Sequence, residues 1–233
     1  RRRPSSLARL RTELEVAQHL FRMEVPVSVP SPELPAEVHR CGQHAVTFWG
    51  HRDNDADAPV GDRAAACLLK AVHQGLDCYQ GHLPLFTDRQ LRCAGAVLAD
   101  PRSLPTLSPS DRTFLADAYA CLKEELLQQT LNLRPLHGDP HRGNLLACRG
   151  GCVLIDFESA CCGPLEWDLS ALPGEGAGVF DADAHLLALL RQLRSICVAV
   201  WCWMRPHRAE EIDQAARSHV NLLRRSVGVC QAP

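Results

Sequence analysis

The sequence lacks the features that mark several protein classes. Its formal net charge is only −2 over 233 residues, so no overall field would attract nucleic acid or a membrane surface. No uninterrupted apolar run reaches the roughly 20 residues that a membrane-spanning helix needs. No signal-peptide core follows the three arginines at positions 1–3. We therefore expect neither a nucleic-acid nor a membrane partner, and the sequence indicates no particular oligomeric state.

Cysteine is abundant, but zinc-site spacing is absent. None of the 12 cysteines forms a Cys-x-x-Cys pair. Cys67, Cys121 and Cys197 lie among alanine, leucine and valine, where a thiol acts as a small buried apolar group. Disulfide frameworks are typical of short secreted chains, whereas this chain is long and rich in helical patterns. We therefore expect free, mostly buried thiols and a cytoplasmic location.

An apolar share of 46% is enough for a sizeable core, in one large domain or two small ones. Helical spacing of apolar residues predicts helices over about 5–23, 61–76, 88–98, 110–130, 166–172, 183–203 and 208–227. The buried stripe expected in the first helix is Leu7, Leu10, Leu14, Ala17 and Phe21. Strands are expected at 38–41 and 44–49, with a turn at Gly42.

Polar residues flank two short apolar segments in the middle of the chain. Segments 145–147 and 152–155 are separated by an Arg-Gly-Gly sequence, which predicts a β-hairpin. Such a hairpin would bring Asn144 and Asp156 together at its open end. Asp139 precedes Asn144 by five residues, on a loop that contains glycine and proline. We therefore expect three oxygen-bearing side chains to converge on one small volume.

This convergence suits phosphoryl transfer. Mg²⁺ prefers oxygen ligands and takes only one or two carboxylates, completing its shell with water and phosphate oxygens. The spacing from His137 through Asp139 to Asn144 fits the catalytic loop of protein kinases, and the Asp-Phe pair at Asp156 fits their metal-binding motif. Alternatively, Asp139 caps a turn and Asp156 ends a strand, because both are ordinary loop residues.

Two motif blocks carry a family resemblance. His-Gly-Asp-x-His-x-x-Asn over 137–144, with Ile-Asp-Phe-Glu at 155–158 and Glu-Trp-Asp-Leu at 166–169, resembles the aminoglycoside phosphotransferase family, which shares the kinase fold with choline kinases. The resemblance implies an α+β, protein-kinase-like, two-lobed fold. A reduced N-terminal lobe would span 1–49, and a mostly helical C-terminal lobe with the catalytic loop would span 50–233.

The same resemblance implies roles for six residues. Asp139 would be the catalytic base, and Asn144 and Asp156 would hold Mg²⁺. Three residues would support the catalytic loop: His137, His141 and Asp168. His141 would brace the loop, and Asp168 would fix it from behind.

An ATP site is implied as well. Glu13 would take the place of the helix glutamate that pairs with a phosphate-gripping lysine in kinases, although a solvated glutamate paired with Arg9 fits the sequence equally. The hinge that meets adenine would be Phe48, Trp49, Gly50 and His51. A simple strand end there fits the residues just as well.

The chain departs from the family pattern before its first helix. No glycine-rich phosphate loop precedes that helix, and no lysine stands before Lys70. We expect either that the chain is a fragment or a truncated product, or that the hinge and the metal alone hold the nucleotide.

The function expected from the resemblance is ATP-dependent transfer of a phosphoryl group to a hydroxyl of a small molecule, such as an aminoglycoside, an amino alcohol or a sugar. Two other classes remain open. A catalytically silent kinase-like binding module would account for the missing lysine and phosphate loop. A thiol-rich metal or redox protein would account for the cysteines, although no cluster has ligand spacing.

Overall fold

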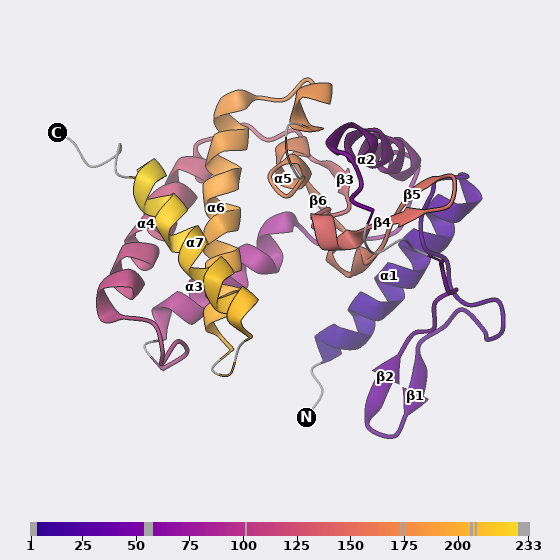
Figure 1. Ribbon diagram of the computed structural model, residues 1–233, viewed down its shortest axis with the longest axis horizontal. Coiled ribbons are helices and arrows are strands. Elements are labelled where there is room, and N and C mark those ends of the chain that lie inside the picture. Colours follow the sequence, from indigo (N-terminus) through magenta and orange to yellow (C-terminus); the bar gives the residue numbers. More distant parts are fainter. Residues whose placement is uncertain are drawn as a thin grey trace. The chain divides into compact units, whose positions relative to one another are not determined.

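The computed structural model describes residues 4–53, 58–100, 102–172, 174, 176–205, 207 and 209–227. The chain folds into two compact units. Figure 1 shows the chain coloured by residue number, from indigo at the N-terminus to yellow at the C-terminus. The first unit combines residues 1–84 and 132–182, and the second combines residues 85–131 and 183–233. The lobe boundary after residue 49 is a different division and stays a prediction.

Two long helices and one short helix frame the first unit. They are α1 (Pro4–Arg22), α2 (Asp62–Leu76) and α5 (Leu165–Leu169). An acidic residue in the first turn of α2, Asp62, suits the positive end of the helix dipole. The apolar stripe of α2 is buried, and α2 packs against α1. Both long helices lie where the sequence predicts them.

The buried face of α1 differs from the expected stripe at one end. Leu14 and Ala17 are buried as expected, but Phe21 is 56% exposed. The face that packs inward is centred on Glu13, Ala17 and Leu20, each less than a tenth exposed. Phe21 lies next to the last residue of the helix and is exposed there, so the prediction of a buried Phe21 is wrong. A carboxylate, Glu13, occupies the buried face instead.

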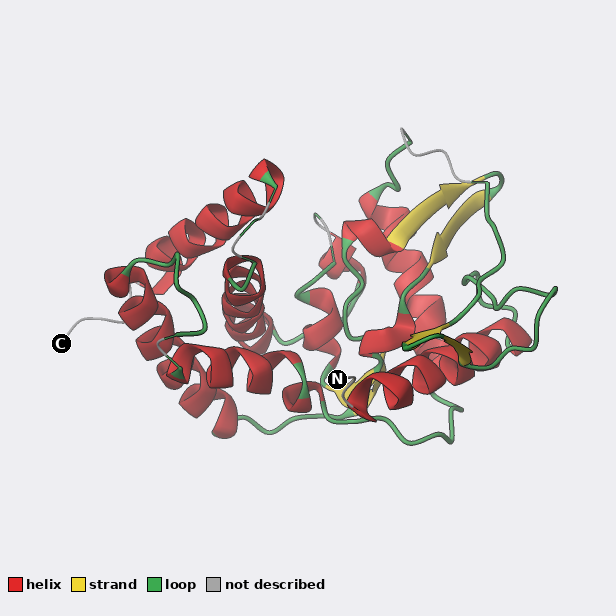
Figure 2. Ribbon diagram, turned by 90° about the horizontal axis from the view of Figure 1, so that it is seen from below, coloured by secondary structure: helices red, strands yellow, loops and turns green. Residues whose placement is uncertain are grey.

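Every described strand belongs to the first unit, and the second unit is helical (Figure 2). The strands form three antiparallel pairs: β1 (His39–Cys41) with β2 (His44–Val46), β3 (Arg134–Leu136) with β6 (Cys161–Gly163), and β4 (Leu145–Cys148) with β5 (Gly151–Leu154). The β4–β5 hairpin predicted from the sequence is confirmed, with Leu145 opposite Leu154. Its turn contains Gly150, whose φ of +89° suits glycine.

The strand expected over 44–49 is shorter than predicted, because its last residues pair elsewhere. β2 ends at Val46, and Trp49 forms a bridge with Pro30. The same extended connection, residues 26–31, also bonds to β5, with the Leu154 N–H donating to the Pro26 carbonyl at 3.2 Å and the Ser28 N–H donating to the Leu154 carbonyl at 3.2 Å. Segment 48–50 is thereby linked through 26–31 to the β4–β5 hairpin.

Three single-turn 3₁₀ helices complete the region around the hairpin. They are η2 (Arg142–Asn144), η3 (Phe157–Ser159) and η4 (Gly176–Val179). The first precedes β4 and the second follows β5 by two residues, so both lie at the open end of the hairpin. α1 packs against η3, and α2 packs against η4.

The second unit is a set of helices around α6 (Ala184–Trp203), which packs against α3 (Gln90–Ala99), α4 (Pro109–Leu127) and α7 (Glu210–Val227). Helix α3 starts later than predicted because η1 (Phe86–Asp88) precedes it. Ser108 caps α4 by accepting a 3.1 Å hydrogen bond from the Asp111 N–H, and Asp183 caps α6.

Helix α6 alone, among the described residues, is long and apolar enough to cross a membrane by length and composition. The charged residues inside it interrupt the apolar run, but its mean hydropathy still reaches 1.4. In the 18-residue stretch of α6 with this hydropathy, 67% is buried inside the structure. The core helix of a soluble protein can have the same length and composition.

The cysteines depart from the expectation of buried thiols. All 11 described cysteines are free, as expected. Cys197 is buried, but Cys67 and Cys121 are exposed, so for these two the prediction is wrong. Cys121 lies beside the stripe that α4 buries, which runs through Ala118 and Leu122, so apolar neighbours in sequence do not bury it.

Candidate active site

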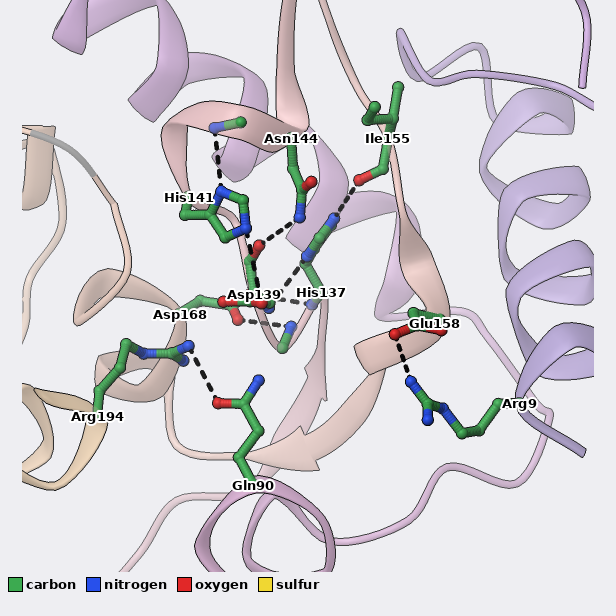
Figure 3. Close-up of polar contacts among 12 residues, drawn as sticks. Arg9, Gln90, His137, Asp139, His141, Asn144, Ile155, Glu158, Asp168 and Arg194 are labelled. Carbon is green, nitrogen blue, oxygen red and sulfur yellow. Dashed lines mark hydrogen bonds and ion pairs between the residues drawn. The ribbon is translucent and has the colours of Figure 1, made fainter. Parts of the chain in front are cut away.

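Asp168 anchors the loop of residues 137–144, the predicted catalytic loop, from a fully buried position on α5. Its Oδ1 accepts a 2.7 Å hydrogen bond from the Gly138 N–H, and its Oδ2 accepts one from the His137 N–H at 3.0 Å. The same Oδ2 lies 2.8 Å from Nε2 of His73 (Figure 3 draws the first two). Burial would raise the pKa of Asp168, but the hydrogen bonds and the nearby histidines together hold that pKa below its usual range.

His137 connects the catalytic loop to the end of β5. Its buried ring donates from Nε2 to the Ile155 carbonyl at 3.0 Å, and its Nδ1 accepts from the Asp139 N–H at 3.1 Å. Because Nδ1 accepts, the neutral ring carries its proton on Nε2. Burial lowers the pKa of His137, although the carboxylates of Asp168, Asp139 and Asp156 act in the opposite direction. The neutral form is therefore the one built into the site.

Gly138 is the residue at which only glycine fits. Its φ is +90°, in a region that residues with a Cβ rarely occupy. A Cβ atom there would collide with the backbone carbonyl oxygen of Ser159. The loop can thus approach the turn after β5 closely, which explains the glycine of the His-Gly-Asp sequence.

Asp139 and Asn144 lie together at the end of the loop (Figure 3). The Nδ2 amide group of Asn144 donates to the backbone carbonyl of Asp139 at 2.9 Å, and the Asn144 side chain is 6% exposed. The Asp139 carboxylate is 29% exposed, and its Oδ2 lies 3.8 Å from Nε2 of His141. Nδ1 of His141 accepts from the Gly143 N–H at 3.0 Å, which caps η2. His141 therefore contacts both ends of the loop.

Asp156 completes the group from the other strand. The Ile155 N–H donates to the Asn144 carbonyl at 3.0 Å, which continues the hairpin past Leu154 and sets Asp156 beside Asn144. Asp156 is exposed and has left-handed backbone angles, φ +66° and ψ +65°, which are uncommon outside glycine but tolerated by aspartate. The structure thus brings Asp139, Asn144 and Asp156 to one end of the hairpin, as the sequence predicts.

Helix α1 contributes a carboxylate to the same region. Glu13 is 8% exposed, so the alternative of a solvated glutamate is wrong. The pKa of Glu13 is raised to about 7, mainly by burial and also by the charges of Asp156 and Glu158, while Arg9 acts in the opposite direction. Arg9 itself forms an ion pair with Glu158 (Figure 3). The role of Glu13 toward a nucleotide stays a prediction.

The predicted hinge, residues 48–51, pairs through its backbone with residues 29–31 on one side. The bridge between Pro30 and Trp49 uses the Phe48 carbonyl and the Gly50 N–H, each at 2.9 Å from its partner on the 29–31 segment. Because backbone groups alternate along an extended segment, the N–H and carbonyl of Trp49 face the opposite side. No described backbone hydrogen bond uses those two groups of Trp49.

The side chains of the hinge segment have mainly local contacts. Phe48 is 45% exposed and lies edge-on to His39, and Trp49 donates from Nε1 to Thr47 Oγ1 at 3.0 Å. His51 is largely exposed, with Nε2 at 3.4 Å from Asp53. These contacts do not assign a role, so the adenine-binding function of residues 48–51 stays a prediction.

His73 belongs to the buried network behind the loop, although no motif in the sequence marks it. It is 2% exposed, and its bond to Asp168 joins α2 to α5, whereas a surface histidine fits the sequence equally well. The signal that could have identified it is its place on the apolar stripe of α2, four residues after Leu69 and three before Leu76.

The oxygen atoms of Asn144 and Asp156 at the end of the hairpin suit a metal ion whose other ligands are phosphate oxygens and water. Among the described residues, no group of three or more histidine, cysteine, aspartate or glutamate side chains is arranged to hold a metal ion. Mg²⁺ in phosphoryl-transfer sites needs only one or two carboxylates, because phosphate oxygens and water complete its shell. One carboxylate from Asp156 and one amide oxygen from Asn144 match that requirement.

Solved structures share this fold at low sequence identity. A microcompartment-associated aminopropanol kinase is 15% identical, with a TM-score of 0.70 over 98% of this chain and 83% of its own. A choline kinase from Streptococcus pneumoniae is 12% identical, with a TM-score of 0.65 over 94% and 80%. An amicoumacin kinase solved with AMP-PNP and Ca²⁺ is 14% identical, with a TM-score of 0.62 over 95% and 78%.

Comparison with the curated proteins finds no match. The sequence profile of the phosphotransferase enzyme family, in contrast, matches residues 1–207 and so covers most of the chain. The structural likeness supports a protein-kinase-like α+β fold with few short strands. The chain therefore belongs to the phosphotransferase enzyme family.

Proposed function

We propose that this protein transfers the terminal phosphoryl group of ATP to a hydroxyl of a small molecule, with Mg²⁺ as cofactor. The observation that carries the proposal is the convergence of Asp139, Asn144 and Asp156 at the open end of the β4–β5 hairpin. The buried bonds of Asp168 and His137 hold the loop in that arrangement. Membership in a family of phosphotransferases supports the reaction class.

In this proposal Asp139 is the general base. Its partly exposed carboxylate accepts the proton of the acceptor hydroxyl as the hydroxyl oxygen bonds to the terminal phosphorus. The bond from phosphorus to the bridging oxygen breaks, and ADP leaves with that electron pair. The Asp139 N–H is held by Nδ1 of His137, so the residue is oriented before substrate arrives. Positioning of this kind supplies a large part of catalysis in phosphoryl transfer.

Asn144 and Asp156 are the proposed metal ligands. The Asn144 amide nitrogen is engaged with the Asp139 carbonyl, so its Oδ1 is the atom available to a cation. Mg²⁺ held there would neutralise charge on the phosphate oxygens. Asp156 has a left-handed backbone and is exposed at the open end of the hairpin, so a metal-bound phosphate could reach its carboxylate.

The nucleotide is proposed to lie against the backbone of residues 48–51. The N–H and carbonyl of Trp49 face away from the 29–31 segment and are suited to the edge of an adenine ring. Glu13 lies near the proposed metal ligand Asp156, whose charge acts on the Glu13 carboxyl group. A related fold binds AMP-PNP, which supports nucleotide use.

The acceptor we propose is a small hydroxylated compound, such as an amino alcohol, an aminoglycoside or a sugar. Relatives in fold are named for aminopropanol, choline and amicoumacin, and the first two are amino alcohols. The free state of the described cysteines supports a cytoplasmic setting. We propose no nucleic-acid or membrane partner.

The test combines nucleotide binding with turnover. Calorimetry would measure the binding of ATP with Mg²⁺, and an ADP-release assay would screen a panel of amino alcohols, aminoglycosides and sugars. We expect binding, turnover with at least one hydroxylated compound, and a loss of roughly 10²- to 10⁴-fold in Asp139→Asn, which keeps the shape but removes the base.

The same measurements separate the proposed enzyme from a catalytically silent kinase-like binding module. The two share a fold and differ in turnover, so kinetics decides between them. Binding without turnover on any acceptor would favour the silent module. Unchanged turnover in Asp139→Asn would remove Asp139 from the mechanism.

A further inference from the structure

An ion pair joins helix α1 to the segment that carries a proposed metal ligand. Arg9 on α1 contacts Glu158 in η3, across 149 positions of sequence (Figure 3). Both side chains are partly buried, at 39% and 40% exposed, and Nε of Arg9 is buried. Both residues belong to the same compact unit, and α1 packs along η3.

Glu158 lies close in sequence to Asp156, the proposed metal ligand. Glu158 follows Asp156 by two residues, so whatever holds Glu158 also limits the movement of Asp156. Asp156 has a left-handed backbone and makes no side-chain hydrogen bond that caps η3. A residue in this sparsely populated conformation persists only when the surrounding structure fixes it.

Two neighbours hold those residues from different elements. The ring of Phe157, 1% exposed, packs against the ring of His137 with centroids 4.7 Å apart. On α1, Arg9 holds the carboxylate of the next residue, Glu158. The first contact ties η3 to the catalytic loop, and the second ties it to α1, one helical turn before Glu13.

We propose that Arg9 and Glu158 form a positioning pair that orients Asp156 for a metal-bound nucleotide. The inference rests on the proposed function, and it adds two residues with no part in the chemistry. Ligands of metal ions are commonly oriented by such outer contacts, whose loss weakens metal binding by about 10- to 100-fold. The pair also couples the position of α1 to the geometry of the metal site.

Electrostatics alone would give a different pattern, which makes the proposal testable. Arg9→Gln removes a positive charge, and Glu158→Gln removes a negative charge, at nearly the same point. Through charge alone, the two changes would shift the affinity for a charged ligand in opposite directions. A positioning pair predicts that both changes weaken binding, since either one breaks the contact.

The experiment measures the dissociation constant of a Mn²⁺ complex of a non-hydrolysable ATP analogue, together with the melting temperature. We expect roughly 10-fold weaker binding in both Arg9→Gln and Glu158→Gln. The exchanged pair, Arg9→Glu with Glu158→Arg, should recover most of the affinity. Arg11→Gln removes a charge from an exposed position two residues along α1 and should bind as the wild type does.

The outcomes separate this inference from the proposed function. A wild-type protein that binds no Mn²⁺–nucleotide overturns the proposed function and the inference with it. If the wild type binds, affinity changes of opposite sign in the two single variants overturn the inference alone. Unchanged affinity in both variants, with only a lower melting temperature, also overturns it, because a merely structural pair would behave in that way.

Discussion

At the scale of single residues, the site depends on groups that are buried and charged or conformationally restricted. Asp168 has no exposed surface, yet two backbone N–H groups and one imidazole satisfy its oxygens. Buried charges persist only with such partners, because an uncompensated charge in the interior is unfavourable by several kcal/mol. The catalytic loop is therefore built on one ionised carboxylate.

Asp168→Asn should lower the free energy of unfolding by about 3 kcal/mol, because an amide turns an NH₂ group toward at least one of the donors. Chemical denaturation would measure this loss. Asp53→Asn changes a carboxylate that is 91% exposed and should alter stability by less than about 0.5 kcal/mol. A loss in Asp168→Asn no larger than that of the control would show that the anchor is not needed.

Gly138→Ala should destabilise the protein by about 2 kcal/mol or more, since φ is +90° and the new methyl group would meet the Ser159 carbonyl. Turnover should fall as well, because the loop must shift away from η3. Gly178→Ala is the matched control, as its new methyl group would have no atom within 4 Å. Equal melting temperatures for the two variants would contradict the steric argument.

At the scale of elements, helix α1 buries one carboxylate, that of Glu13, near the more exposed carboxylates of Asp156 and Glu158. The face that packs inward carries Glu13 in place of a fully apolar stripe. Since burial and the charges of Asp156 and Glu158 disfavour its ionised form, α1 is less stable in place when Glu13 is charged.

The pH dependence of Glu13 has a definite sign. The pKa of Glu13 in the folded protein is about 7, above the ordinary value of 4.5. The contribution of protonated Glu13 to the free energy of unfolding is therefore fully present below pH 4.5 and is lost as the pH rises through 7. Glu13→Gln removes this dependence and should be more stable than wild type at pH 8, by about 2 kcal/mol. Urea unfolding at pH 5 and pH 8 would measure it, with Glu15→Gln, an exposed position on α1, as control. A difference between Glu13→Gln and wild type that does not grow from pH 5 to pH 8 would contradict the argument.

At the scale of the whole molecule, the proposed ligand should stabilise the folded chain. The proposed metal site would join β4, β5 and the loop that carries Asp139, so a ligand that binds there would be bound only by the folded state. A non-hydrolysable ATP analogue with Mg²⁺ at 100 times its dissociation constant should add about 2.7 kcal/mol to the free energy of unfolding.

Removal of the metal provides the control for that prediction. With EDTA present, the analogue should stabilise the wild type far less, and Asp156→Asn should show the same small effect with or without Mg²⁺ because its metal ligand is weakened. Thermal unfolding monitored by circular dichroism would follow both. A metal-independent shift of equal size would indicate that the nucleotide binds away from Asp156.

The sequence by itself determined the helices, the hairpin and the identity of the convergent polar residues. Apolar spacing is a local property, so α2, α6 and the β4–β5 hairpin follow from neighbours along the chain. The motif residues Asp139, Asn144 and Asp156 were identified in the same way, because their spacing and the hairpin turn already implied that they meet.

Only the tertiary structure decided which positions at the edges and ends of the predicted helices are exposed and which partners the buried polar groups have. The burial of Glu13, the bond between His73 and Asp168, and the exposure of Phe21, Cys67 and Cys121 depend on which elements pack against them. The contact between Arg9 and Glu158 joins residues 149 positions apart, and no local pattern encodes such a pairing. The physical reason is that burial and ion pairing are set by what packs against a surface, which the neighbouring residues in the chain do not specify.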